Sequence, residues 1–162
     1  MKRIAILAAL LLTTISSFAQ SGKSIYQKYS EAEGVSAVYI SPAMFRLIGK
    51  IPDLYTGEDE SVNLAPIIQS LSGMYVIDSE NPSINATLKA DAEKFVNNGH
   101  YELLLEAKES GEVVRMYSVG SETVVNGFVM ISDEGAEMTF IYLDGKMNRD
   151  DLENLLAESM KD

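Results

Sequence analysis

Four segments rich in β-forming residues follow one another in the second half of the chain. They cover residues 101–108, 113–119, 123–132 and 136–143. The connections between them are three or four residues long and contain glycine, which is typical of hairpins. Strands joined so closely must run antiparallel, so the pattern predicts a four-stranded antiparallel meander. We interpret Asn126-Gly127 as a bulge within the third segment, because a turn there would leave very short arms.

Before this meander, segments whose apolar residues recur at helical spacing alternate with short apolar runs. A further helical segment follows the meander. The apolar runs at residues 35–40 and 74–77 predict two more strands. Helices are expected over residues 24–32, 42–49, 63–72 and 82–98 and again after Asn148. Asp144-Gly145 predicts a turn before the last helix, which Asn148 can cap. The expected fold class is α+β, a mainly antiparallel sheet with helices packed on one face.

The first nineteen residues have the layout of a secretory signal peptide. A positive start precedes an apolar stretch at residues 4–15, and small residues stand at Ser17 and Ala19, where signal peptidase reads the chain. A membrane anchor is the competing interpretation, but it needs roughly 20 apolar residues. We expect cleavage after Ala19, a single α+β domain over residues 20–162, and a periplasmic or secreted location in a Gram-negative cell.

Composition argues against several classes of function. The 162 residues include no cysteine, which excludes disulfides, thiolate metal sites, cysteine nucleophiles and lipid attachment at cysteine. Thirteen basic residues face 24 acidic ones, and loss of Lys2 and Arg3 leaves 11 against 24, a net charge near −13. Such a surface repels phosphate backbones and anionic lipid headgroups. We therefore expect no nucleic acid partner and, after cleavage, no membrane partner.

One histidine, His100, is the only candidate for histidine-based catalysis. A Ser/His/Asp arrangement around it stays open on sequence grounds, but no Gly-x-Ser-x-Gly elbow accompanies it. A single histidine in a loop is usually a surface residue. We predict no catalytic residue and no cofactor.

Metal binding would have to use oxygen ligands, which suit calcium or magnesium. Two acidic clusters qualify by composition: residues 58–60, and Asp144 with Asn148, Asp150 and Asp151. The first lacks the alternating spacing and distal glutamate of a calcium loop, and a solvated charge run explains it. A turn and a helix cap explain the second. We predict no metal site.

Three further segments carry a resemblance to known proteins: VSAVYISPAMF at residues 35–45, GHYELL at 99–104 and LDGKM at 143–147. Together with the intervening hairpins, they resemble a family of small exported Bacteroidota proteins catalogued as domain of unknown function 4252. The resemblance extends over nearly all of the mature region. It implies a Gram-negative envelope location and brings no activity, substrate or site residue. Some members look like lipoproteins, a pattern from which this cysteine-free chain departs.

The function expected is that of a soluble, non-enzymatic domain that acts through contacts with a protein partner in the envelope. We base this expectation on the presence of an export signal and the absence of a recognisable set of catalytic residues in the sequence. The alternative is a small-ligand binder or hydrolase with a pocket between sheet and helices, which a serine and a carboxylate beside His100 in a cleft would favour. A calcium protein with oxygen ligands is a third hypothesis.

Overall fold

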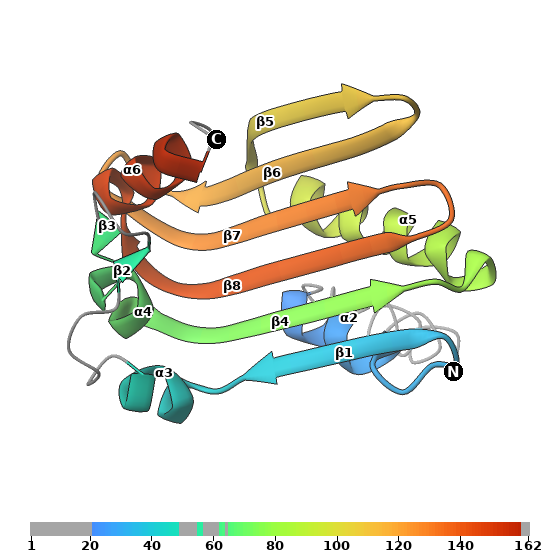
Figure 1. The fold of residues 1–162 in the computed structure, drawn as a ribbon, viewed down its shortest axis with the longest axis horizontal. Helices are drawn as coiled ribbons and strands as arrows, with labels where there is room; N and C mark the ends of the chain where they lie inside the picture. The colour runs from blue at the N-terminus through green and yellow to red at the C-terminus, as the bar shows by residue number, and fades with distance from the viewer. Residues whose placement is uncertain (1–20, 49–54, 57–61, 64, 160–162) are drawn as a thin grey trace, which may run out of the picture.

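A six-stranded antiparallel sheet forms the centre of the molecule (Figure 1). The structure, a computed structural model, describes residues 21–48, 55–56, 62–63 and 65–159. The strands lie in the order β1-β4-β8-β7-β6-β5. Their bounds are β1 Val35–Ile40, β4 Leu71–Ser79, β5 Glu102–Glu109, β6 Glu112–Gly120, β7 Val124–Asp133 and β8 Met138–Asn148, while the short β2 Tyr55–Thr56 and β3 Val62–Asn63 pair separately. The predicted meander is therefore confirmed as β5 to β8.

Helices lie on both faces of the sheet. Their bounds are α2 Gly22–Tyr29, α3 Pro42–Ile48, α4 Ala65–Ser70, α5 Pro82–Asn98 and α6 Arg149–Ser159. Helices α2 and α5 contact each other and pack on one face, whereas α3, α4 and α6 gather at one end of the other, at the left in Figure 1. The α+β class is confirmed. Helices also lie on the face opposite the one expected, because β4, β7 and β8 carry apolar side chains on both sides.

Local sequence explains where the longest helix begins and which side it buries. Asn81 caps α5, its Oδ1 accepting from the Ser83 N–H at 3.0 Å, and Pro82 follows in the first turn. The buried side chains of α5 recur at helical spacing and are Leu88, Ala92, Phe95 and Val96. This stripe faces the sheet and holds α5 along it.

Two apolar cores lie on opposite faces of the sheet. The first core joins α2 and α5 to strand residues that include Ile77, Val129 and Phe140. The second core joins α3, α4 and α6 to strand residues that include Phe128 and Met147. We call the face under α2 and α5 the covered face and the opposite one the open face, because helices occupy only one end of the latter.

The prediction of a turn at Asp144-Gly145 is wrong. Strand β8 runs through both residues to Asn148, and Asp144 pairs with Gly73 of β4 and Gly127 of β7. A side chain at Gly145 would lie 2.5 Å from the Ser70 carbonyl oxygen, so this glycine permits a close backbone approach instead of a turn. The register of β7 against β8 shifts between Val125 and Gly127, as expected for a bulge at Asn126-Gly127.

The helix expected over residues 63–72 is shorter than predicted. Helix α4 ends at Ser70, and Gly73, expected to stop that helix, lies inside β4. Strand β4 is longer than the apolar run at 74–77 suggested, because it is a central strand hydrogen-bonded to both β1 and β8. Pairing on two sides extends a strand beyond its local apolar signal.

The segment predicted as a signal peptide, residues 1–19, lies outside the described residues, as does the acidic run at 58–60. Within the part of the chain that the structure describes, no helix is both long enough and apolar enough to cross a membrane.

Candidate functional site

One row of apolar side chains crosses the whole open face. Every second residue of a strand points to the same face, and the strand register aligns one such residue from each of the six strands. The row consists of Val38, Val76, Ile141, Met130, Met116 and Leu105. Val38 is 51% exposed, and the other members of the row are partly exposed. We call this set the apolar row; a continuous strip of this kind is typical of a surface that another molecule covers.

Helices border one side of the apolar row. Phe45 of α3, Ile67 of α4 and Leu152 of α6 pack with buried strand residues into the second core. Met116 and Met130 of the row contact the margin of that core. The row thus lies beside a helical wall and is not buried under it.

Polar side chains from four of the six strands border the other side of the row. The next set of paired residues contains the polar Ser36, Asp78, Thr139 and Ser132, followed by the apolar Val114 and Ala107. The Thr139 hydroxyl donates to Asp78 Oδ1 at 3.0 Å, and the Ser132 hydroxyl donates to Glu134 Oε1 at 3.3 Å. These bonds hold both carboxylates at the open face.

Three further carboxylates lie on the same side. Glu109 and Glu112 pair with each other at the end of the β5–β6 hairpin and share strand parity with Leu105 and Met116 of the row. Glu80 continues the β4 alternation, its N–H donating to the Gly34 carbonyl. The resulting acidic border comprises Asp78, Glu80, Glu109, Glu112 and Glu134. Among the described residues no lysine or arginine forms an ion pair with it.

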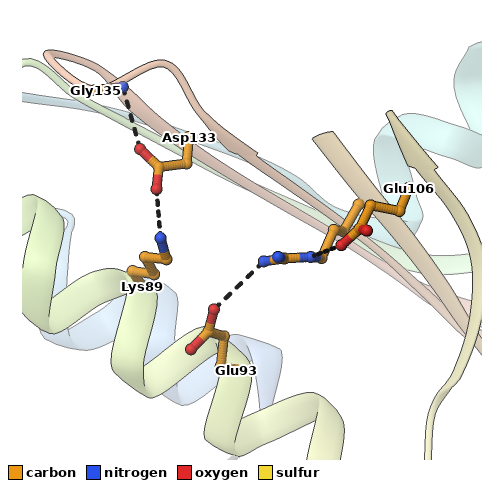
Figure 2. Close-up of polar contacts among 6 residues, drawn as sticks. Lys89, Glu93, Glu106, Asp133 and Gly135 are labelled. Carbon is orange, nitrogen blue, oxygen red and sulfur yellow. Dashed lines mark hydrogen bonds and ion pairs between the residues drawn. The ribbon is translucent and has the colours of Figure 1, made fainter. Parts of the chain in front are cut away.

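Basic side chains are instead held at the covered face, between α5 and the sheet (Figure 2). Lys89 of α5 contacts Asp133 with Nζ and Oδ2 2.6 Å apart. Arg115 of β6 contacts Glu106 of β5 at 2.7 Å and Glu93 of α5 at 3.4 Å. The Lys89 ammonium lowers the pKa of Asp133. These ion pairs join α5 to the sheet. They also engage Lys89 and Arg115 on the covered face.

A tyrosine cluster fills the end of the covered face beside α2. The Tyr39 and Tyr75 rings stack with centroids 4.8 Å apart, and Tyr75 lies 5.9 Å from Tyr142 on the next strand. Burial, with Tyr39 nearby, raises the pKa of Tyr75 to about 12. Burial also raises the pKa of Tyr142, reinforced by Tyr101 and Asp144. These hydroxyls stay neutral at physiological pH, which suits packing better than acid–base chemistry.

Polar residues line two of the hollows in the described part of the molecule. One, of about 260 Å³, lies between α5 and the β7–β8 turn and is lined by residues that include Asn85, Lys89 and Asp133. The Asn85 amide donates from Nδ2 to the Ala136 carbonyl at 2.8 Å, while its Oδ1 is buried without a partner among the described residues. The other, of about 460 Å³, is bordered by Glu102, Glu122 and Arg149.

His100 lies in the turn between α5 and β5, with an exposed side chain and a positive φ of 54°. Its backbone N–H donates to the Asn97 carbonyl. In the described residues, no hydrogen bond or ion pair joins the imidazole to a serine or a carboxylate. The structure therefore does not assemble the triad that the sequence left open.

The acidic cluster near the last helix is divided by the structure. Asn148 caps α6, its Oδ1 accepting from the N–H groups of Asp150 and Asp151 at 2.9 and 3.4 Å. Asp144 lies beside Tyr142 on the covered face. Across the described ranges, no group of three or more histidine or carboxylate side chains could hold a metal ion.

The chain matches the family model described as a domain of unknown function (DUF4252) over residues 29–155. The chain belongs to the DUF4252 family. The DUF4252 match takes in all six strands of the central sheet, so the apolar row and the acidic border lie within it. No curated protein and no solved structure matches the chain.

Sequence reasoning did not identify the open face of this DUF4252 domain. The signal was present: in β4, β7 and β8 neighbouring residues such as Val76 and Ile77, or Phe140 and Ile141, are both apolar. Strands with this pattern present two apolar faces. Which of them the helices cover depends on the tertiary arrangement.

Proposed function

We propose that this protein is an exported, non-enzymatic domain that binds a protein partner in the bacterial envelope through the open face of its sheet. The apolar row is the observation that carries the proposal. Its six side chains are contiguous, lie on a rigid sheet and have no described helix over them. An apolar centre with a polar border is the usual anatomy of a protein interface.

The proposed location is supported by the predicted signal peptide and the position of α2. Cleavage after Ala19 would leave Ser21, whose hydroxyl caps α2 by accepting from the Ser24 N–H at 3.2 Å. The mature chain would thus retain every residue of that helix. Mass spectrometry of the protein from a periplasmic fraction should find Gln20 at the N-terminus, and an intact Met1 there would contradict export by this route.

Site-specific photo-crosslinking in cells tests the partner hypothesis. A photoreactive amino acid at Val38, the most exposed member of the row at 51%, should give a discrete crosslinked band. The same amino acid at Lys94, exposed on α5, is the matched control and should give none. Equal crosslinking at both positions, or at neither, would contradict the proposal.

A small-ligand binder is the second candidate, and the buried, unpartnered Asn85 Oδ1 favours it. A ligand donor in the hollow beside α5 would satisfy this oxygen. Ligand screening by NMR should then shift the Asn85 side-chain amide signals and the backbone amide signals around the hollow, and Asn85→Ala should abolish the shifts of the backbone amides. The hydrolase form of this hypothesis has less support, because His100 is exposed and, among the described residues, no hydrogen bond joins its imidazole to a serine or a carboxylate.

A further inference from the structure

We propose that the segment bound by the open face is a cationic amphipathic helix of a protein partner, lying across the strands. This inference rests on the proposed function and adds the chemistry of the partner. Three features of the open face carry it: the direction of the apolar row, the helical wall on one side, and the acidic border on the other.

The apolar row has dimensions that suit one helix. Neighbouring strands are about 4.8 Å apart, so the row spans about 24 Å from β1 to β5. An α-helix rises 1.5 Å per residue, so about 16 residues cover that distance. The wall of α3, α4 and α6 leaves a strip on which a helix can lie with its apolar stripe against Val76, Ile141 and Met130.

The acidic border determines the charge of that helix. Its carboxylates follow the side of the strip away from the helical wall, with Asp78 and Glu80 at one end and Glu109 and Glu112 at the other. Nearby cations cannot compensate them, because Lys89 and Arg115 are paired on the covered face. Lysine or arginine flanking an apolar stripe would meet these carboxylates directly.

Charge complementarity disfavours two other occupants. A second copy of this chain would bring its own acidic border and a net charge near −13 into the interface. A membrane rich in anionic lipid would be repelled for the same reason. A cationic helix satisfies both the apolar row and the border.

A designed peptide provides the direct test. The probe is a fluorescein-labelled 16-residue helix of leucine and lysine, with leucine at i, i+3, i+4 and i+7 spacing. We expect saturable binding to residues 20–162 by fluorescence anisotropy, weakening as salt is added. The same peptide with glutamate in place of lysine should not bind. Equal binding of both peptides would overturn the proposed partner chemistry.

Matched variants separate the acidic border from overall charge. The triple variant E109Q/E112Q/E134Q removes three carboxylates from the border, and E31Q/E122Q/E153Q removes three exposed ones that do not belong to it. We expect the first to weaken peptide binding about tenfold, the combined effect of three peripheral charge contacts, and the second by less than about twofold. An equal effect of both variants would show attraction by net charge alone and overturn the proposal.

Variants of the row separate this inference from the proposed function. Ile141→Asp, and Val38→Asp at the exposed edge strand in case the central substitution unfolds the sheet, should abolish peptide binding while circular dichroism remains native. If the lysine peptide does not bind but the photoreactive residue at Val38 still crosslinks in cells, the inference of a cationic helix is overturned and the proposed partner binding is retained. A dimer that Val38→Asp converts to monomer in light scattering would identify a second copy as the occupant, which also overturns the inference.

Discussion

The two faces of the sheet carry apolar residues from the same strands but differ in what surrounds them. On the covered face, Ile77 and Phe140 are fully buried under α2 and α5, and ion pairs join α5 to the strands. On the open face, their chain neighbours Val76 and Ile141 stay partly exposed beside carboxylates for which the described residues provide no ion pair. Helices therefore close the covered face, while the middle of the open face reaches solvent.

The largest expected difference comes from truncating adjacent residues of β4. Ile77→Ala leaves a cavity in the first core and should lower the free energy of unfolding by about 2–5 kcal/mol. Val76→Ala removes less buried surface and should cost about 1 kcal/mol or less. Urea denaturation of residues 20–162 measures both. If both variants lose the same unfolding free energy, the two faces are packed equally tightly, which would contradict the difference described between them.

A helix–sheet contact on the covered face gives the next largest effect. Gly22 of α2 lies against the Tyr142 ring, and an added Cβ would overlap it. Gly22→Ala should therefore destabilise the protein by about 1–3 kcal/mol despite the better helix propensity of alanine. Lys23→Ala, at the next and exposed position, should change stability by less than about 0.5 kcal/mol. Thermal unfolding of the two variants side by side would show whether α2 is as tightly packed as the structure indicates.

Alkaline pH should weaken the covered face selectively. Burial raises the pKa of Tyr75 to about 12, above the value near 10 of an unfolded tyrosine. Its contribution to stability is thus complete below about pH 10 and is lost as pH rises through about 12. Tyr75→Phe should flatten this part of the profile of unfolding free energy against pH. A wild-type profile that stays level up to pH 12 would contradict the assignment.

The ion pairs of the covered face should have the smallest effect. Lys89→Met breaks the ion pair with Asp133. Because the Lys89 and Asp133 side chains are 40% and 26% exposed, the free energy of unfolding should fall by only about 0.5 kcal/mol. Because Lys89 lowers the pKa of Asp133 below its usual 3.8, the contribution is present above that pH and is lost as pH falls through the lower folded-state value. The difference between wild type and variant should accordingly shrink and vanish as the pH falls below 3.8 and Asp133 becomes protonated. A difference that persists there would assign the effect to the lysine stem and not to the charge.

Local chemistry explains which elements were predictable. Hairpin connections such as Ser110-Gly111, where both residues have positive φ, reveal antiparallel neighbours directly. The caps Asn81 and Asn148 were also recognisable, because capping depends only on groups a few residues away. These signals depend on residues within one turn or hairpin, so they can be recognised from the sequence without knowledge of the rest of the chain.

Non-local pairing explains what was missed. The position of β8 between β7 and β4 joins residues about 70 apart, such as Leu71 and Gly145, and this contact makes Asp144-Gly145 part of a strand. The length of β4 depends on the same pairing. Neither follows from local propensity, because tertiary contacts decide strand length and turn choice when local signals are weak.

By itself, the sequence determined an α+β domain with a C-terminal antiparallel meander, without cysteine chemistry and with a strongly acidic charge. Those properties depend on composition, periodicity and short-range hydrogen bonding. Only the tertiary structure decided which side of the sheet the helices cover, and so which apolar residues reach solvent. The physical reason is that strands with apolar residues on both sides carry no local mark of their buried face; helices brought in from distant parts of the chain make that choice.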